Sequence, residues 1–171
     1  LFGKHGAEKW NVSDGAWEKL VELLTPVVEL AKNSDITLVV ETGNNAMITS
    51  CFLGRKLIDD LNTEHLKVLW DPANALYCGE NPSKNALDSM EGGYLGHVHM
   101  KDVEVSIHQA TIECVALGKG QMSPHLQAIS DRLNEIGYDG SMSLESVYRP
   151  SDGDFEDGFN ASIERFKDLY S

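Results

Sequence analysis

Four short apolar segments recur along the chain, and a residue that can bind a metal closes each of them. They are Ile36–Glu41, Leu66–Asp71, Tyr94–His99 and Ser141–Glu145. Each segment has about the length of one β-strand and is too short for a typical helix. A carboxylate at the end of a buried strand is unfavourable unless something pairs with it. Four such ends, which lie 30, 28 and 46 residues apart, predict strand ends that converge on one cation.

The stretches around these segments carry the three-and-four spacing of apolar residues that is typical of amphipathic helices. The spacing predicts helices over 13–33, 47–61, 83–91 and 123–137. A last helix is marked by Phe155, Phe159, Ile163, Phe166 and Leu169.

Local signals suggest where these helices begin and what lies between them. We expect Ser13 or Asp14 to cap the first helix, and Ser123 with Pro124 to begin the fourth. Residues 72–82 are interpreted as a loop. Residues 101–120 are the least regular part, with a short extended piece indicated by the alternation of Val103, Val105 and Ile107.

Strict alternation of helix and strand predicts an α/β fold with a parallel sheet and helices outside it. Neither GxGxxG nor GxxxxGK[ST] occurs, so the phosphate turn of a doubly wound sheet is missing. A (β/α)8 TIM barrel instead carries its functional residues at the carboxyl ends of several strands, which favours the barrel. A whole barrel takes about 250 residues. The 171 residues here form a single domain, 1–171, and we expect the first half of the barrel to lie outside this chain.

The amino-acid composition limits the classes of partner that the chain is expected to bind. The formal charge of −13 disfavours nucleic acid and anionic membranes, because both need Lys and Arg at the contact. No apolar stretch approaches the roughly 18 residues of a membrane span. The three cysteines, Cys51, Cys78 and Cys114, form no CxxC motif and no disulfide framework, so a reducing, cytoplasmic location is expected.

From about Trp17 onward, the chain resembles the xylose isomerase-like TIM barrel superfamily, in particular its sugar phosphate isomerase/epimerase branch. The stretches that carry the likeness are Val40–Asn44, Trp70–Asn74, His97–Asp102, Leu117–Gly120, Gly137–Gly140 and Ser143–Glu145. Ketose 3-epimerases, hydroxypyruvate isomerases and inosose dehydratases are similar in this half. The resemblance makes the four segments the last four strands, so that the chain is the C-terminal portion of the barrel.

The resemblance also implies a metal site. In the family one divalent ion is held by Glu, Asp, His and Glu from strands five to eight. The matching residues are Glu41, Asp71, His99 and Glu145. Such an oxygen-rich set with one imidazole suits Mn²⁺ best, with Mg²⁺, Co²⁺ or Zn²⁺ as alternatives.

The expected reaction is isomerisation or epimerisation of a sugar, sugar phosphate or keto-polyol through a metal-stabilised enediolate. We expect Glu41 and Glu145 to act as acid and base, and Lys101 to steady the developing oxyanion. His97 shares a strand face with His99 and is a candidate substrate contact, as is Asp102, which could instead orient Lys101.

Two positions depart from the epimerase pattern and leave the substrate open. Asn74 stands where the epimerases often carry a substrate-binding His, so it either contacts the substrate differently or only shapes a turn. Val105 stands where they carry an Arg. Lys101 followed by Asp102 instead matches the dehydratases and general isomerases.

Other functions compete with this interpretation. Within the family, an inosose-type dehydratase is the nearest alternative, and the acidic charge speaks against the apurinic endonucleases. A non-catalytic barrel fragment that binds a partner belongs to another class altogether. We expect a small carbohydrate as ligand, and either a homo-oligomer or pairing with the other half barrel, because half a barrel exposes sheet edges and apolar surface.

Overall fold

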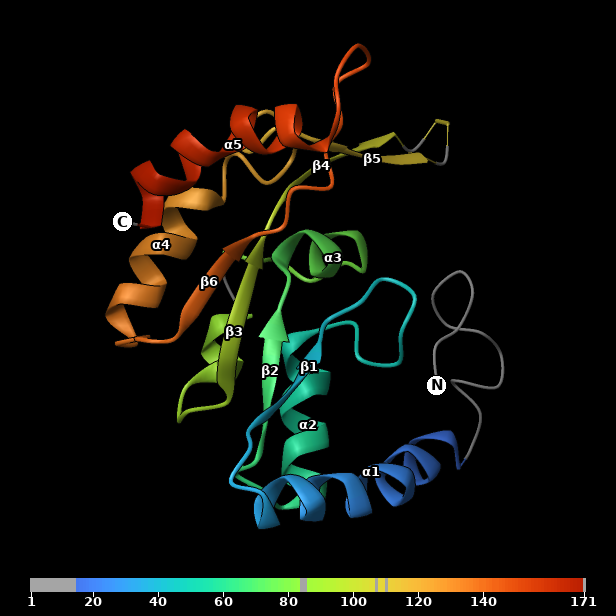
Figure 1. Ribbon diagram of the computed structural model, residues 1–171. Helices are drawn as coiled ribbons and strands as arrows, with labels where there is room; N and C mark the ends of the chain where they lie inside the picture. Colours follow the sequence, from blue (N-terminus) through green and yellow to red (C-terminus); the bar gives the residue numbers. More distant parts are fainter. Residues whose placement is uncertain (1–14, 84–85, 107, 110, 171) are drawn as a thin grey trace.

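The computed structural model describes residues 15–83, 86–106, 108–109 and 111–170. Its centre is a sheet of four parallel strands in the order β1-β2-β3-β6. The strands are Leu38–Glu41, Leu66–Trp70, Leu95–Met100 and Ser141–Leu144. Because all three pairings are parallel, the four carboxyl ends lie at one end of the sheet (Figure 1). The predicted α/β fold with a parallel sheet is confirmed.

Alternation along the strands explains how the sheet packs. In β2, Leu66, Val68 and Trp70 are buried, whereas the side chains between them are only half-buried. Helix α2, Cys51–Leu61, covers this buried face. A Cβ on Gly54 of α2 would lie 2.6 Å from Val68 Cγ2, so the helix and β2 are in direct contact. The other face of the sheet carries polar side chains, among them Glu41, Lys67 and His97, together with the apolar Val39 and Leu69.

The remaining helices are α1, α3, α4 and α5, with the bounds Ala16–Asn33, Pro72–Tyr77, Leu126–Glu135 and Phe155–Tyr170. Helix α1 contacts α2, and α4 and α5 pack together beside β6 (Figure 1). Pro26 lies inside α1, and Gly15 occupies the N-cap position of this helix. The predicted caps, Ser13 and Asp14, lie outside the described residues. None of the described helices combines the length and apolar character that crossing a membrane requires.

Two segments that were expected to be irregular contain regular structure. The 72–82 loop begins with α3, because the Asp71 side chain accepts hydrogen bonds from Ala73 N and Asn74 N and Pro72 occupies the first helical turn. The 101–120 stretch forms an antiparallel hairpin of β4, Asp102–Ser106, and β5, Thr111–Val115. Ile107 lies outside the described residues.

Several predicted helix bounds are wrong. The second helix begins at Cys51 rather than at 47, because the Ser50 side chain accepts a hydrogen bond from Leu53 N and caps it there. The stretch 83–91 holds only a 3₁₀ turn, Leu87–Met90, and residues 84–85 lie outside the described part. The fourth helix begins at Leu126, so Ser123 is not its cap.

Candidate metal centre

Four predicted ligands meet at the carboxyl end of the sheet. Glu41 ends β1, Asp71 directly follows β2, His99 lies near the end of β3, and Glu145 directly follows β6. One ligand atom from each residue lies within 4.8 Å of all the others. Parallel pairing produces this meeting, because it brings the ends of four strands that are distant in sequence to one edge.

Two candidate ligand atoms at this meeting point lack the hydrogen bonds that buried polar atoms normally make. Asp71 Oδ2 and His99 Nδ1 are buried, and neither makes a hydrogen bond of good geometry with any described residue. His99 Nδ1 lies 3.5 Å from Glu41 Oε1 and 3.9 Å from Glu145 Oε2. Asp71 Oδ2 has the ammonium group of Lys101 as an ion-pair partner at 2.6 Å. Since buried polar groups are nearly always satisfied, the His99 nitrogen without a hydrogen bond among three carboxylates suits a bound cation. The residues present therefore fit a divalent ion.

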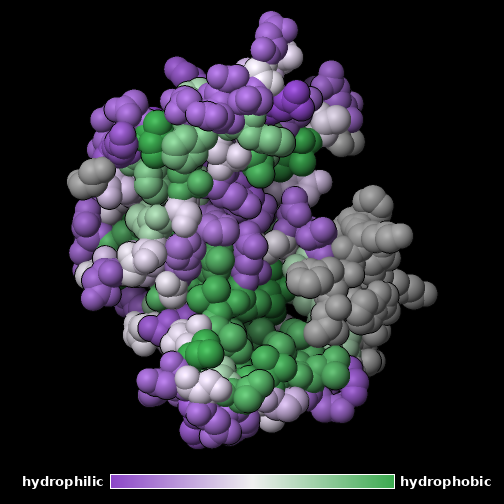
Figure 2. Space-filling model, in the orientation of Figure 1, coloured by the Kyte–Doolittle hydropathy of each residue, from purple (hydrophilic) through white to green (hydrophobic). Residues whose placement is uncertain are grey.

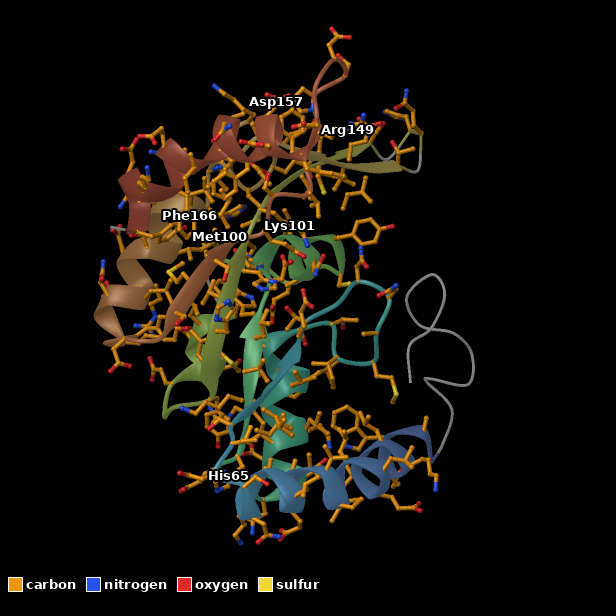
Figure 3. The ribbon with its side chains drawn as sticks, viewed as in Figure 1. His65, Met100, Lys101, Arg149, Asp157 and Phe166 are labelled. Atoms are coloured by element: carbon orange, nitrogen blue, oxygen red, sulfur yellow. The ribbon has the colours of Figure 1, made fainter. Side chains whose placement is uncertain are left out.

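The ammonium group of Lys101 lies beside the same carboxylates. Its Nζ is 2.6 Å from Asp71 Oδ2 and 2.6 Å from Glu145 Oε2, and its side chain is only 12% exposed. Figure 3 shows Lys101 at the end of β3, where the chain leaves the sheet for the hairpin. Burial lowers the pKa of Lys101, but the two carboxylates outweigh this and raise it, so the side chain stays charged.

The two carboxylates that Lys101 contacts differ in their environments. Burial raises the pKa of Asp71 to about 6, and Lys101 offsets the shift only in part. Burial also acts to raise the pKa of Glu145, but the hydrogen bond and charge of Lys101 outweigh it and lower that pKa. Glu145 is therefore ionised at neutral pH, and it is partly exposed, whereas Asp71 has 0% exposure.

Thr42, a residue to which sequence reasoning gave no role, joins the ends of β1 and β2. Its Oγ1 accepts a hydrogen bond from Asp71 N at 2.9 Å and donates to Asp71 O at 3.3 Å. Asn74 Nδ2 donates to Thr42 O at 3.0 Å. The signal in the sequence was that a small polar residue directly follows Glu41. In the structure this residue, Thr42, is fully buried.

His97 lies one layer below the centre, on the same face of β3 as His99. The two rings meet edge to face with centroids 5.2 Å apart. His97 Nε2 also lies 2.7 Å from Ser143 Oγ across the sheet. Burial and the nearby His99 lower the pKa of His97. Ser143 is a second residue that sequence reasoning passed over, although it stands two positions before Glu145 on the same strand face.

The carboxylate of Asp102 is turned away from the centre. Oδ1 accepts hydrogen bonds from Val103 N and Met122 N, and Oδ2 accepts them from Gly118 N and Gly120 N, each at 2.9 Å. The side chain is 1% exposed. Its contact with substrate stays a prediction, and as placed the carboxylate serves the turn that follows the hairpin.

The other histidines with described positions lie away from the centre. His65 is at the opposite end of the sheet (Figure 3), where its Nδ1 lies 3.1 Å from Ile36 O. His108 is exposed beside the hairpin, and His125 Nδ1 lies 2.8 Å from Ser83 Oγ. His5 lies outside the described residues.

A hollow of about 650 Å³ opens beside the centre. Its polar wall is formed by Glu41, Asn74, Lys101 and Glu145, and its apolar wall comes from β1, α1 and the loop after β1. Figure 2 shows polar side chains gathered in the middle of this face above an apolar area. The arrangement offers a polyhydroxylated ligand both a charged end and an apolar surface.

Solved structures with the same fold extend well beyond this chain. D-psicose 3-epimerase from Clostridium cellulolyticum H10, solved with D-tagatose, is 20% identical, with a TM-score of 0.68 over 91% of this chain and 56% of that one. The IOLI protein, solved with a zinc atom, is 18% identical, with a TM-score of 0.76 over 99% and 60%. A probable 3-DHS dehydratase from Bacillus anthracis is 16% identical, with a TM-score of 0.74 over 97% and 61%.

The chain spans about half to three fifths of the length of these structures. No curated protein sequence matches it. The family model described as xylose isomerase-like TIM barrel, by contrast, matches residues 2–169, which is nearly the whole chain. Together with the parallel sheet and the ligand set at its carboxyl end, this match shows that the chain belongs to the xylose isomerase-like TIM barrel family.

Proposed function

We propose that the chain carries the metal-binding half of a divalent-metal-dependent isomerase or epimerase that acts on a small sugar or keto-polyol. One observation carries the proposal: four candidate ligand atoms from the ends of four neighbouring parallel strands lie within 4.8 Å of one another, and the nitrogen His99 Nδ1 among them is buried without a hydrogen bond to any described residue. The ketose epimerase among the structural neighbours supports the choice of substrate class.

Glu41, Asp71, His99 and Glu145 would hold the ion. Their three carboxylates and one imidazole favour Mn²⁺, with Mg²⁺, Co²⁺ and Zn²⁺ as alternatives, and the zinc in one neighbour supports a divalent ion. When bound, such an ion polarises the substrate carbonyl and stabilises the negative charge that develops on its oxygen.

Glu145 and Glu41 are the acid–base pair of the proposal. Both are partly exposed, and they come from the two outer strands of the sheet, so they approach a substrate in the centre from different sides. One carboxylate removes the proton from the carbon next to the carbonyl, and the electron pair moves to the carbonyl oxygen. Return of a proton to the opposite face of that carbon gives the epimer, and return to the neighbouring carbon gives the isomer.

Three further side chains have positioning or binding roles in the proposal. Lys101 keeps Glu145 ionised and lies where it can donate to the developing oxyanion. Asn74 lines the hollow and is oriented by its bond to Thr42 O. His97 supports the face of the site below His99 and is offered as a substrate contact.

Solvent-proton exchange tests the proposal. In ²H₂O, turnover of a ketose is expected to place deuterium at the reacting carbon, because the abstracted proton exchanges on the carboxylate. Glu145→Gln is expected to lower this incorporation by about 100-fold or more, since the amide cannot take the proton. Glu113→Gln, on the exposed outer part of β5, is the matched control and should leave it unchanged. Unchanged incorporation in Glu145→Gln would remove that residue from the mechanism.

A dehydratase of the inosose type is the second candidate, favoured by the adjacent Lys101 and Asp102 and by the dehydratase among the structural neighbours. It would share the first proton abstraction and then lose a hydroxyl as water. Release of an unsaturated ketone, seen by ultraviolet absorbance, separates it from epimerisation.

A binding module without catalysis is the third candidate, favoured by the apolar wall of the hollow along β1. Metal analysis and the mass of the purified chain distinguish it from the enzymes. One ion per chain with ketose turnover supports the enzyme. A metal-free chain in a stable complex supports the binding module, whether the partner is a second copy or another half barrel.

A further inference from the structure

The carboxylate of Asp102 lies next in the chain to Lys101 but points into a different environment. Two oxygens accept four backbone N–H groups, two of which come from glycines of the segment 117–122, called here the 117–122 turn. A carboxylate with four acceptor sites can satisfy four donors at once, which an amide or hydroxyl cannot do. The four bonds close the turn around the first residue of β4.

We propose that Asp102 is a positioning residue for Lys101, because its carboxylate fixes the backbone at the point where the chain leaves β3. The proposal rests on the proposed function only in giving Lys101 a role there. Its geometric basis is independent of any metal or substrate.

Lys101 is held on both sides. The preceding residue is tied down because Met100 O accepts a hydrogen bond from Glu145 N at 2.9 Å. The following residue is tied down by the Asp102 carboxylate and its four donors. With both neighbours fixed, the direction of the Lys101 Cα–Cβ bond is fixed, and from this origin the side chain brings its Nζ to 2.6 Å from both Asp71 Oδ2 and Glu145 Oε2.

The space around Asp102 is tightly filled, so a small movement there has to reach Lys101. The cavity that Lys101 and Asp102 line together has a volume of only about 10 Å³. A Cβ on Gly120 would lie 2.4 Å from Val103 O and 2.5 Å from Asp102 Oδ1. The 117–122 turn can approach the carboxylate this closely only because residue 120 is glycine.

The turn also has a second attachment, which supplies a control. Leu117 N donates to Ser162 Oγ at 3.1 Å, and Ser162 Oγ in turn donates to Gly158 O within α5. Ser162→Ala removes this attachment and leaves Leu117 N without its partner, but it keeps all four bonds of Asp102. The two attachments of one turn can therefore be removed separately.

Lysine labelling reads out the position of Lys101 directly. The chain is treated with a limiting amine-acetylating reagent without added metal or substrate, and the rate at each lysine is measured by mass spectrometry. Lys101 should react slowly in the unaltered protein, since its side chain is 12% exposed, whereas Lys19 and Lys167, at 54% and 57%, provide internal surface rates.

In Asp102→Asn, the amide nitrogen faces two backbone N–H groups, so two bonds of a buried group are lost. We expect the Lys101 rate to rise about ten-fold, because losses of this kind shift a local opening equilibrium by at least that factor. Ser162→Ala is expected to lower the urea midpoint while changing the Lys101 rate less than about two-fold. Rates at Lys19 and Lys167 should stay constant in both variants.

An unchanged Lys101 rate in folded Asp102→Asn overturns the proposal, as does an equal rise in Ser162→Ala. If Asp102→Asn does not fold, Gly120→Ala decides by the same labelling, because its methyl group displaces the carboxylate without removing it. Failure of both variants to fold would make Asp102 a folding residue and equally overturn the assignment. Since labelling needs no turnover, a chain without isomerase activity can still pass this test, and an active chain can fail it.

Discussion

The two ends of the parallel sheet make an instructive contrast. The hollow at the amino end is larger, about 850 Å³, than the hollow of about 650 Å³ that runs along β1 and reaches the candidate metal centre at the carboxyl end. The walls of the larger hollow mix both signs of charge, with Lys32 and Lys67 among Glu29, Asp59 and Glu64. Within the part of the chain that the structure describes, however, Glu41, Asp71, His99 and Glu145 are the one group of three or more residues placed to share an ion.

The two ends also differ in whether their buried polar atoms make hydrogen bonds. Tyr94 donates its hydroxyl to Asp59 at 2.6 Å, and His65 Nδ1 lies 3.1 Å from Ile36 O. At the carboxyl end, His99 Nδ1 is buried without a hydrogen bond to any described residue, and Asp71 Oδ2 has only its ion pair with Lys101. Buried polar atoms without hydrogen bonds at strand ends, rather than the volume of a hollow, therefore mark the candidate site.

The largest effect on the difference between the two ends is expected from replacing one of the candidate metal ligands. Asp71→Ala is expected to weaken Mn²⁺ binding by more than the roughly 10–100-fold that loss of an outer partner costs. The reason is that its buried oxygen contributes directly to the donor set. Isothermal titration calorimetry measures the change. Glu64→Gln, at the other end of the sheet, is the control, and an equal loss there would show that the ion binds elsewhere.

Removing the positive charge of Lys101 should have the next largest effect. Lys101→Met leaves the carboxylates of Asp71 and Glu145 close together without a positive charge. We expect a loss of about 3 kcal/mol in the free energy of unfolding without metal, as for other broken buried pairs. Saturating Mn²⁺ should restore part of it, because the ion supplies the missing charge. Urea titrations with Mn²⁺ and with a chelator test this, and a loss indifferent to Mn²⁺ would contradict it.

A smaller effect is expected from the support behind Asp71. Thr42→Val removes the hydroxyl that accepts from Asp71 N and leaves that donor buried. The free energy of unfolding should fall by about 1–2 kcal/mol. Mn²⁺ affinity should fall about ten-fold because the ligand loses its orientation. Thr42→Ser keeps the hydroxyl and should retain most of the affinity, and a loss equal to that of Thr42→Val would point to packing instead.

The smallest expected effect concerns the layer below the centre. Ser143→Ala deprives His97 Nε2 of its partner, while His97 keeps its ring contact with His99. We expect unfolding to become easier by about 0.5–1 kcal/mol, with a change in Mn²⁺ affinity of only a few-fold. His65→Gln at the opposite end is the comparison, and it should leave Mn²⁺ affinity unchanged.

Much of the sheet could be predicted from the sequence because its strands are short apolar runs with a two-residue alternation. Three of the four runs contain an observed strand, the run Tyr94–His99 covers β3 except for its last residue, Met100, and Trp70, which closes β2, is fully buried. Glu41 and Asp71 could be placed at strand ends because a carboxylate ends an apolar run clearly. The metal role of these residues stays a prediction, although the structure brings their ligand atoms together with those of His99 and Glu145.

What the sequence did not reveal depends on contacts between distant residues. Lys101 lies 44 positions from Glu145, and no local pattern indicates that they touch. The four donors of Asp102 come from residues 1 to 20 positions away, so its orientation is decided by a turn of irregular sequence. The start of α4 was misplaced for a similar reason, since Ser123 has the right chemistry for a cap but its own N–H is bound to Gly120 O.

The four candidate ligands lie at the ends of four different strands, and a helix or hairpin separates each from the next. A cation held by all of them would thus link all four strands of the sheet. The complete binding site would form only after every strand has joined the sheet. The affinity for the ion would then report how completely the sheet is assembled. Removal of the ion by a chelator would destabilise the whole sheet rather than one loop.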